Sequence, residues 1–143
     1  MKVIICGAGQ VGWQIARHLS GENNDVTVVD NNPELVRRAT ETLDVQGIAG
    51  FASYPDILDR AGARDADMII AATYSDEVNM VTCQVAHSVF AIPRKIARLR
   101  AQSYLTAIYS DLAMPSWDLH HRAVRRRHAQ LLRRRHRHGR DHV

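Results

Sequence analysis

A glycine-rich turn between an apolar run and a helical pattern is the feature that most constrains this chain. The apolar run ends at Cys6, and the sequence from Gly7 to Gly12 reads Gly-Ala-Gly-Gln-Val-Gly. A second apolar run ends at Asp30, about 20 residues beyond the glycines, the spacing expected of a ribose-binding acid. Strand, glycine turn, helix, strand and terminal acid together indicate a dinucleotide-binding βαβ unit. The alternative is an ordinary βαβ turn with no ligand.

Each part of this pattern has a mechanical reason. Gly7 permits a sharp turn out of the strand, and Gly9 has no Cβ to keep a pyrophosphate away from the backbone. Gly12 lets the following helix pack close to the sheet. The start of that helix offers N–H groups and a partial positive charge to phosphates. The Asp30 carboxylate can accept hydrogen bonds from both ribose hydroxyls, so the pattern favours a nucleotide with an unphosphorylated ribose.

Strands alternate with helices through the first part of the chain. Asn32 is a predicted N-cap before Pro33, and Ser75 is a predicted N-cap of a later helix. This alternation predicts an α/β fold, a Rossmann-like doubly wound parallel sheet with helices on both faces. The expected helices are 10–19, 33–43, 55–61 and 76–90, and the expected strands after the first two are 45–50, 67–72 and 95–99.

The charge divides the chain into two unlike parts. Residues 1–112 hold 10 Lys and Arg against 13 Asp and Glu, whereas residues 113–143 hold nine Arg against two Asp and carry six of the eight His. We therefore expect a nucleotide-binding domain over 1–112 and a basic Arg/His-rich tail over 113–143. The tail is expected to be disordered or a loosely helical solvated segment.

The tail allows other interpretations. Its arginines could bind nucleic acid or anionic lipid through phosphate contacts, and its histidines could bind metal. It lacks regular aromatic interleaving and fixed ligand spacing, so we expect no specific nucleic-acid partner and no metal site. A one-base shift would also convert His120-His121-Arg122 to an apolar sequence such as Ile-Ile-Ala. Residues after about Pro115 are therefore hypothesised to be out of frame, which resequencing would test.

Machinery for catalysis is not evident in the sequence. A dehydrogenase needs a His, Lys or Tyr as acid/base beside its substrate, and the histidines of the first 112 residues are His18 and His87. Both are expected on helices, facing solvent or satisfied by neighbours. There is no YxxxK, HExxH or GxSxG motif. Cys6 and Cys83 lack metal-site spacing and are expected to be reduced core thiols. No catalytic residues are predicted.

Several stretches beyond the glycine motif resemble one known family. The sequence is similar to the regulator-of-conductance domain (RCK or KTN) of Trk-type potassium-uptake regulatory proteins over residues 1 to about 112. The Asp-Glu-Val-Asn-Met and Ile-Ala-Arg stretches are specific to that family, whereas the glycine motif is not. The stretches that carry the resemblance are Gly50-Phe51-Ala52-Ser53, Leu58, Ala61-Gly62-Ala63, 65–67, 72–80, 83–86 and 96–100.

This resemblance implies a cytosolic, non-enzymatic subunit that binds NAD(H), with ATP or ADP as further candidates. It implies homo-oligomers, from dimers to tetrameric rings, on the inner face of the plasma membrane. There they contact a Trk-type potassium-translocating membrane subunit, which would make this chain a peripheral regulator that gates potassium transport. The family's chains continue with small ligand-binding subdomains. Here Ser116-Trp117-Asp118-Leu119 and the clustered Arg and His follow instead.

The resemblance also places residues around the nucleotide. Thr73 and Tyr74 follow the fourth strand, across the crevice at which such sheets bind ligands. Arg98 follows the fifth strand and suits a phosphate, although a salt bridge to a neighbouring acid is the alternative. Phe51 and Ala52 lie near the expected adenine position, where related domains often have an acid or His, so apolar stacking is expected. The candidate site residues are Gly7, Ala8, Gly9, Gln10, Val11, Gly12, Asp30, Phe51, Ala52, Thr73, Tyr74 and Arg98.

Three functions thus remain in view. The favoured one is a nucleotide-sensing regulatory subunit of potassium uptake. A small NAD-dependent oxidoreductase without a visible substrate domain is the alternative, and a nucleic-acid-binding protein acting through its tail is the third. Asn79, just inside a predicted helix, is interpreted equally as a packing or an interface residue.

Overall fold

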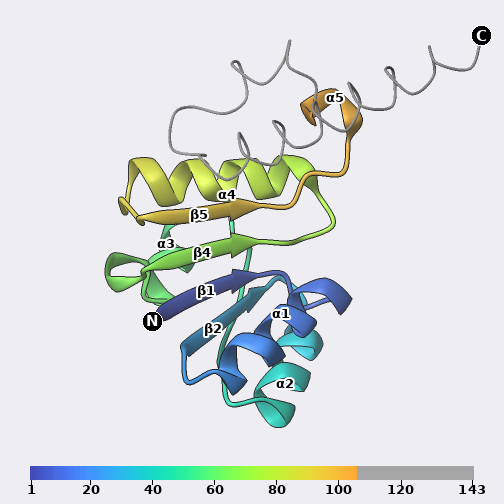
Figure 1. Ribbon diagram of the computed structural model, residues 1–143, viewed down its shortest axis with the longest axis vertical. Helices are drawn as coiled ribbons and strands as arrows, with labels where there is room; N and C mark the ends of the chain where they lie inside the picture. The colour runs from blue at the N-terminus through green and yellow to red at the C-terminus, as the bar shows by residue number, and fades with distance from the viewer. Residues whose placement is uncertain (106–143) are drawn as a thin grey trace, which may run out of the picture. The chain divides into compact units, whose positions relative to one another are not determined.

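Residues 1–100 fold around one parallel sheet. The computed structural model describes residues 1–105, and within them five strands pair in the order β3-β2-β1-β4-β5 (Figure 1). All four strand pairs are parallel. The chain builds outward from β1 on one side and then returns to add β4 and β5 on the other, so the switch point lies between β1 and β4. The elements are β1 (Lys2–Cys6), α1 (Gln10–Gly21), β2 (Asp25–Asp30), α2 (Pro33–Thr42), β3 (Gln46–Ala49), α3 (Pro55–Arg60), the 3₁₀ helix η1 (Ala63–Asp65), β4 (Met68–Ala71), α4 (Asp76–Ser88), β5 (Arg94–Ala97) and α5 (Gln102–Leu105).

Alternate residues of β1 face two separate cores. Val3 and Ile5 pack on one face with residues of α1 and α2, whereas Ile4 and Cys6 pack on the other with residues of α3 and α4. All four side chains are fully buried. A strand that is apolar on both faces needs cover on both sides, which explains its continuous hydrophobic run. The sheet is therefore doubly wound, and the predicted fold class is confirmed.

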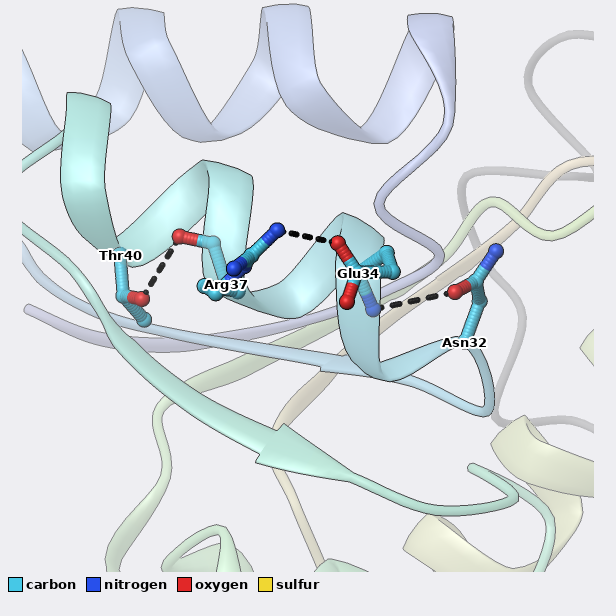
Figure 2. A network of polar contacts seen from close by, with 4 residues as sticks. All are labelled: Asn32, Glu34, Arg37 and Thr40. Atoms are coloured by element: carbon cyan, nitrogen blue, oxygen red, sulfur yellow. Dashed lines mark hydrogen bonds and ion pairs between the residues drawn. The ribbon is translucent and has the colours of Figure 1, made fainter.

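Helix α2 begins directly after the predicted ribose acid. Asn32 Oδ1 accepts a hydrogen bond from the Glu34 N–H at 3.0 Å, and Pro33 occupies the first turn (Figure 2). Glu34 pairs with Arg37 one turn further on, and Thr40 Oγ1 donates to the Arg37 carbonyl at 2.9 Å. These local contacts fix the start of the helix, and hence the loop that follows Asp30.

Helix α4 has the second predicted cap. Ser75 Oγ accepts a hydrogen bond from the Val78 N–H at 3.2 Å. Asp76 and Glu77 lie in the first turn, where negative charge favours the helix dipole. Figure 1 shows α4 running along β4 and β5, whereas α1 and α2 lie beside β1 and β2. The start of α4 therefore lies at the carboxyl edge of β4.

The helices and strands agree closely with those predicted from the sequence. Every predicted helix and strand within residues 1–105 is present, with ends that differ by two residues at most. Helices η1 and α5 were not predicted. Residues 1–100 form one compact unit, and Ala101 begins a second. The predicted basic tail at 113–143 lies outside the described residues. No helix among residues 1–105 is long and apolar enough to cross a bilayer.

Two predictions about individual side chains are confirmed. Cys6 and Cys83 are buried and form no disulfide, and burial raises the pKa of the Cys6 thiol far above its ordinary value. His18 is exposed on α1 and pairs with Glu22, and His87 is exposed on α4. Within residues 1–105, no three His, Cys, Asp or Glu side chains gather closely enough to hold a metal ion.

Candidate functional site

The glycine turn after β1 is held by close backbone packing. Gly7 has a φ of +107°, which side-chain-bearing residues rarely adopt, and its N–H donates to the Val29 carbonyl at 2.7 Å. A Cβ at Gly7 would lie 2.7 Å from the Ala72 carbonyl oxygen. A Cβ at Gly12 would lie only 1.7 Å from the Gly7 carbonyl oxygen. Both glycines are therefore required for α1 to begin where it does.

Asp30 connects this turn to the next loop. Its Oδ2 accepts a hydrogen bond from the Ala8 N–H at 2.8 Å, and its Oδ1 accepts one from the Asn32 N–H at 2.8 Å. The side chain is half-buried. A carboxylate has about four acceptor positions, so two remain for a ligand. The structure thus gives this acid a scaffolding contact on each oxygen that sequence reasoning did not anticipate.

The start of α1 lies beside Tyr74. Gly9 is the N-cap of α1, and its carbonyl accepts the Trp13 N–H at 2.9 Å. The first turn of α1 contains no acidic residue, so nothing in that turn opposes an approaching anion. A Cβ at Gly9 would lie 3.2 Å from the Tyr74 hydroxyl. Tyr74 is 71% exposed, and its ring stacks with the Arg100 guanidinium 5.3 Å from the ring centroid.

Thr73 and Arg98 stand opposite the glycine turn on the far side of the switch point. Thr73 follows β4 and Arg98 follows β5, and the Arg98 N–H donates to the Ala71 carbonyl at 2.8 Å. Both residues are half-buried. A fully buried side chain, that of Asn79, contacts the backbone of both. Helix α4 therefore joins the loop after β4 to the chain that leaves β5.

The end of β3 supplies an apolar wall. Phe51 is 51% exposed, and its ring packs on that of Tyr54 with centroids 5.2 Å apart. Ala52, beside it, is buried. An exposed aromatic face next to a buried small residue suits a flat apolar group.

These segments line an open cavity of about 430 Å³ at the carboxyl edge of the sheet. This volume is in the usual range for small-molecule sites. Of the predicted site residues, ten line the cavity, while Ala8 and Gly12 lie in the framework of the turn. The lining residues are Gly7, Gly9, Gln10, Val11, Asp30, Asn31, Asn32, Leu35, Phe51, Ala52, Ala72, Thr73, Tyr74, Ser75, Val78 and Arg98.

Some lining residues were not predicted as part of the site. Asn32 and Ser75 were identified only as helix caps. A helix that follows a strand of a parallel sheet begins at the carboxyl edge of the sheet, so its cap lies there too. Asn31, Leu35, Ala72 and Val78 carry no sequence signal of their own. Their positions, one to seven residues after the end of β2 or β4, would have been the available clue.

The cavity lining contains one acidic and one basic side chain. Among its lining residues Asp30 is the acidic side chain and Arg98 the basic one, and none of them is His, Lys or Cys. The Asp30 carboxylate can accept hydrogen bonds from a ligand, and the Arg98 guanidinium can donate them to an anionic group of the same ligand.

The doubly wound parallel sheet, the glycine turn and the cavity at the switch point define a Rossmann-like domain. Residues 3–114 match the family model described as the TrkA-N domain. The chain belongs to the TrkA-N domain family.

One curated relative is the Trk system potassium uptake protein TrkA of Azorhizobium caulinodans. It is 59% identical over 105 residues, a match that covers 73% of this chain and 23% of the relative. The chain thus spans about a quarter of the length of such relatives. The family resemblance inferred from the sequence is confirmed.

Two solved structures share the fold. The NAD(P)-binding domain of an exopolyphosphatase-related protein from Archaeoglobus fulgidus superimposes with a TM-score of 0.65 at 13% identity, covering 92% of this chain and 97% of that one. The Kef C-terminal domain of Shewanella denitrificans in its AMP-bound form gives 0.59 at 20% identity, covering 97% and 95%. At these identities the likeness supports the fold alone.

Proposed function

We propose that this chain is a nucleotide-sensing regulatory unit of a Trk-type potassium uptake system and is not an enzyme. One observation carries the proposal. In a TrkA-N domain, the glycine turn, Asp30 and Arg98 converge on one cavity at the switch point of the sheet. Switch-point crevices are where doubly wound sheets bind their ligands. The ligand proposed is NAD(H), with ATP and ADP as the other candidates.

The residues present fit such a ligand. Gly9 carries no Cβ at the start of α1, where backbone N–H groups and the helix dipole favour anions. The Tyr74 ring, which lies against Gly9 and is largely exposed, would move aside for a pyrophosphate. The free acceptor positions of Asp30 suit ribose hydroxyls. Arg98 suits a second phosphate group, and the exposed face of Phe51 suits the adenine.

Regulation would follow from differential binding. A ligand shifts an equilibrium between two assembly states only as far as it prefers one of them. Oxidised and reduced NAD, or ATP and ADP, differ in charge, so they can bias the surroundings of Arg98 differently. The chain would transmit this bias within a homo-oligomer, a dimer or a tetrameric ring. That oligomer would lie in the cytoplasm against the membrane subunit that translocates potassium.

A small NAD-dependent oxidoreductase is the competing function. Its supporting observation is the glycine turn itself, which dehydrogenases share. Against it, the cavity lining contains no His or Lys, and Tyr74 is the one tyrosine in it. The sequence has no YxxxK pair that would make this tyrosine an acid/base. Consumption of NAD(H) in the presence of a small carbonyl or alcohol would favour this alternative, and we expect none.

Potassium uptake in a strain that lacks its own regulator tests the proposal. Residues 1–112 would be joined to an intact family C-terminal portion, and the chimera would carry either no change or Asp30→Ala with Arg98→Ala. A matched control, Asp59→Ala with Arg64→Ala, also removes one acid and one base, but from an exposed ion pair outside the cavity. We expect uptake from the unchanged chimera and the control but not from the site variant. Normal uptake from the site variant would contradict the sensor.

A further inference from the structure

Asn79 on α4 makes an unusual set of contacts for a fully buried side chain. Its Oδ1 accepts hydrogen bonds from the Thr73 N–H at 2.9 Å and from the Thr73 hydroxyl at 2.7 Å. Its Nδ2 donates to the Thr73 carbonyl at 3.1 Å and to the Arg98 carbonyl at 2.8 Å. One amide therefore joins the loop after β4 to the chain that leaves β5.

We propose that Asn79 is a positioning residue for phosphate recognition. It fixes the backbone of Thr73 and Arg98 on the side of the cavity opposite the glycine turn. The inference rests on the proposed nucleotide binding and deepens it. Asn79 does not line the cavity itself. It acts through the backbone of two residues that do, and Arg98 is the cationic one. A small shift of that backbone would move the guanidinium away from a ligand phosphate.

A second contact supports the same arrangement. The Asp76 carboxylate, which is buried, accepts the Arg100 N–H with both oxygens at 2.9 and 3.0 Å. The first turns of α4 thus contact the chain after β5 at two residues, Arg98 and Arg100. The Arg98 N–H is held separately by the Ala71 carbonyl, so its backbone is fixed on both sides.

The chemistry requires an amide at this position. The Asn79 amide offers a carbonyl oxygen to the Thr73 donors and two N–H groups to the Thr73 and Arg98 carbonyls, whereas a hydroxyl of similar size has only one hydrogen to donate. A carboxylate would have no donor for the Arg98 carbonyl, and an apolar side chain would leave the buried partners unpaired. A residue that served packing alone would not need both ends of an amide.

Titration of the full chain with ADP and with adenosine tests this role. The variant is Asn79→Ser, which leaves the net charge unchanged. We expect ADP to bind about tenfold more weakly than to the wild type, the loss typical of one charge-assisted hydrogen bond. Adenosine, which has no phosphate, should lose less than about twofold. A purely structural defect would weaken both ligands alike.

Two controls on α4 separate positioning from stability. Thr82→Val alters another fully buried residue of α4, and Ala86→Gly lowers the stability of the helix. Neither residue lines the cavity, so both variants should bind ADP as the wild type does at temperatures at which thermal melts show them folded. If Asn79→Ser does not fold, Asn79→Gln keeps the amide but displaces it, and the same loss is expected.

A double-mutant cycle gives the decisive readout. On an Arg98→Ala background, Asn79→Ser should weaken ADP binding less than twofold further, because no guanidinium is left to position. Equal losses for ADP and adenosine, or additive effects in the cycle, would overturn the inference while leaving nucleotide binding intact. Failure of the wild type to bind ADP, ATP or NAD(H) would instead overturn the proposed function, and this inference with it.

Discussion

The Oδ2 atom of Asp30 lies 2.8 Å from the backbone nitrogen of Ala8, so the acid that ends β2 is hydrogen bonded to the glycine turn that follows β1. The other carboxylate oxygen accepts the Asn32 N–H just before α2. The residue expected to bind ribose therefore also holds two cavity loops in place before any ligand arrives. Its substitution should affect stability as well as binding.

Asp30→Ala is the first test. We expect nucleotide binding to weaken by about 1.5–3 kcal/mol, as for hydrogen bonds to a charged group. The free energy of unfolding should fall by about 1–3 kcal/mol, because the buried Ala8 N–H loses its acceptor. Calorimetric titration and urea unfolding measure the two effects. Asp59→Ala, an exposed acid outside the cavity, should leave binding unchanged, and an equal loss there would contradict the assignment.

Gly9→Val tests the phosphate position. The new side chain would occupy the space before the start of α1 and meet the Tyr74 ring, whose hydroxyl would lie 3.2 Å from the added Cβ. Tyr74 is largely exposed and can move aside, so the domain should remain folded by circular dichroism. We expect binding to fall by more than about tenfold, since the valine blocks a pyrophosphate. Unchanged affinity would place the phosphates elsewhere.

Gly12→Ala should reduce the stability of the domain, whereas Gly9→Val should reduce nucleotide binding. An added Cβ would lie 1.7 Å from the Gly7 carbonyl oxygen, and backbone cannot give way as a flexible side chain can. We expect loss of more than about 3 kcal/mol of stability, as for severe overpacking of a core. Thermal melting checks this, with Gly21→Ala on the same helix as the control, because nothing lies within 4 Å of that position. A normal melting temperature for Gly12→Ala would show that α1 packs differently.

The sequence predicts those features of the structure that depend on contacts between residues close together in the chain. Asn32 and Ser75 cap their helices through hydrogen bonds that span two or three residues, and both caps were predicted. The fold class followed from alternating apolar runs, because parallel sheets need cover on both faces. The turn at Gly7 followed from the glycine spacing.

The contacts that shape the cavity are not local. The bond from Asp30 to Ala8 spans 22 residues and exists only because β1 and β2 pair in register. Asn79 reaches Arg98 across 19 residues, and the pairing of β4 and β5 brings the two together. The sequence therefore indicated which residues belong to the site but not which ones hold it in shape.

The two cysteines provide a test of core packing. Burial raises the pKa of the Cys6 thiol, chiefly by desolvation and then through neighbouring Cys83 and Asp30, so the reactive thiolate is scarce in the folded chain. We expect Cys6 and Cys83 to react with iodoacetamide at pH 8 on the order of 10³-fold more slowly than in urea. Mass spectrometry of the alkylated peptides measures both rates. Rapid alkylation of Cys6 in the native chain would mean that β1 is not in the core.

The central claim is that the cavity binds a nucleotide with an unphosphorylated ribose and does not consume it. Isothermal titration of the full chain with NAD, NADH, ATP, ADP and NADP tests this claim directly, followed by chromatography of the recovered ligand. We predict that at least one of the first four binds, that NADP binds at least about tenfold more weakly because its 2′-phosphate would meet Asp30, and that the ligand is recovered unchanged. Equal affinity for NADP and NAD, turnover of the nucleotide, or no binding at all would contradict the account.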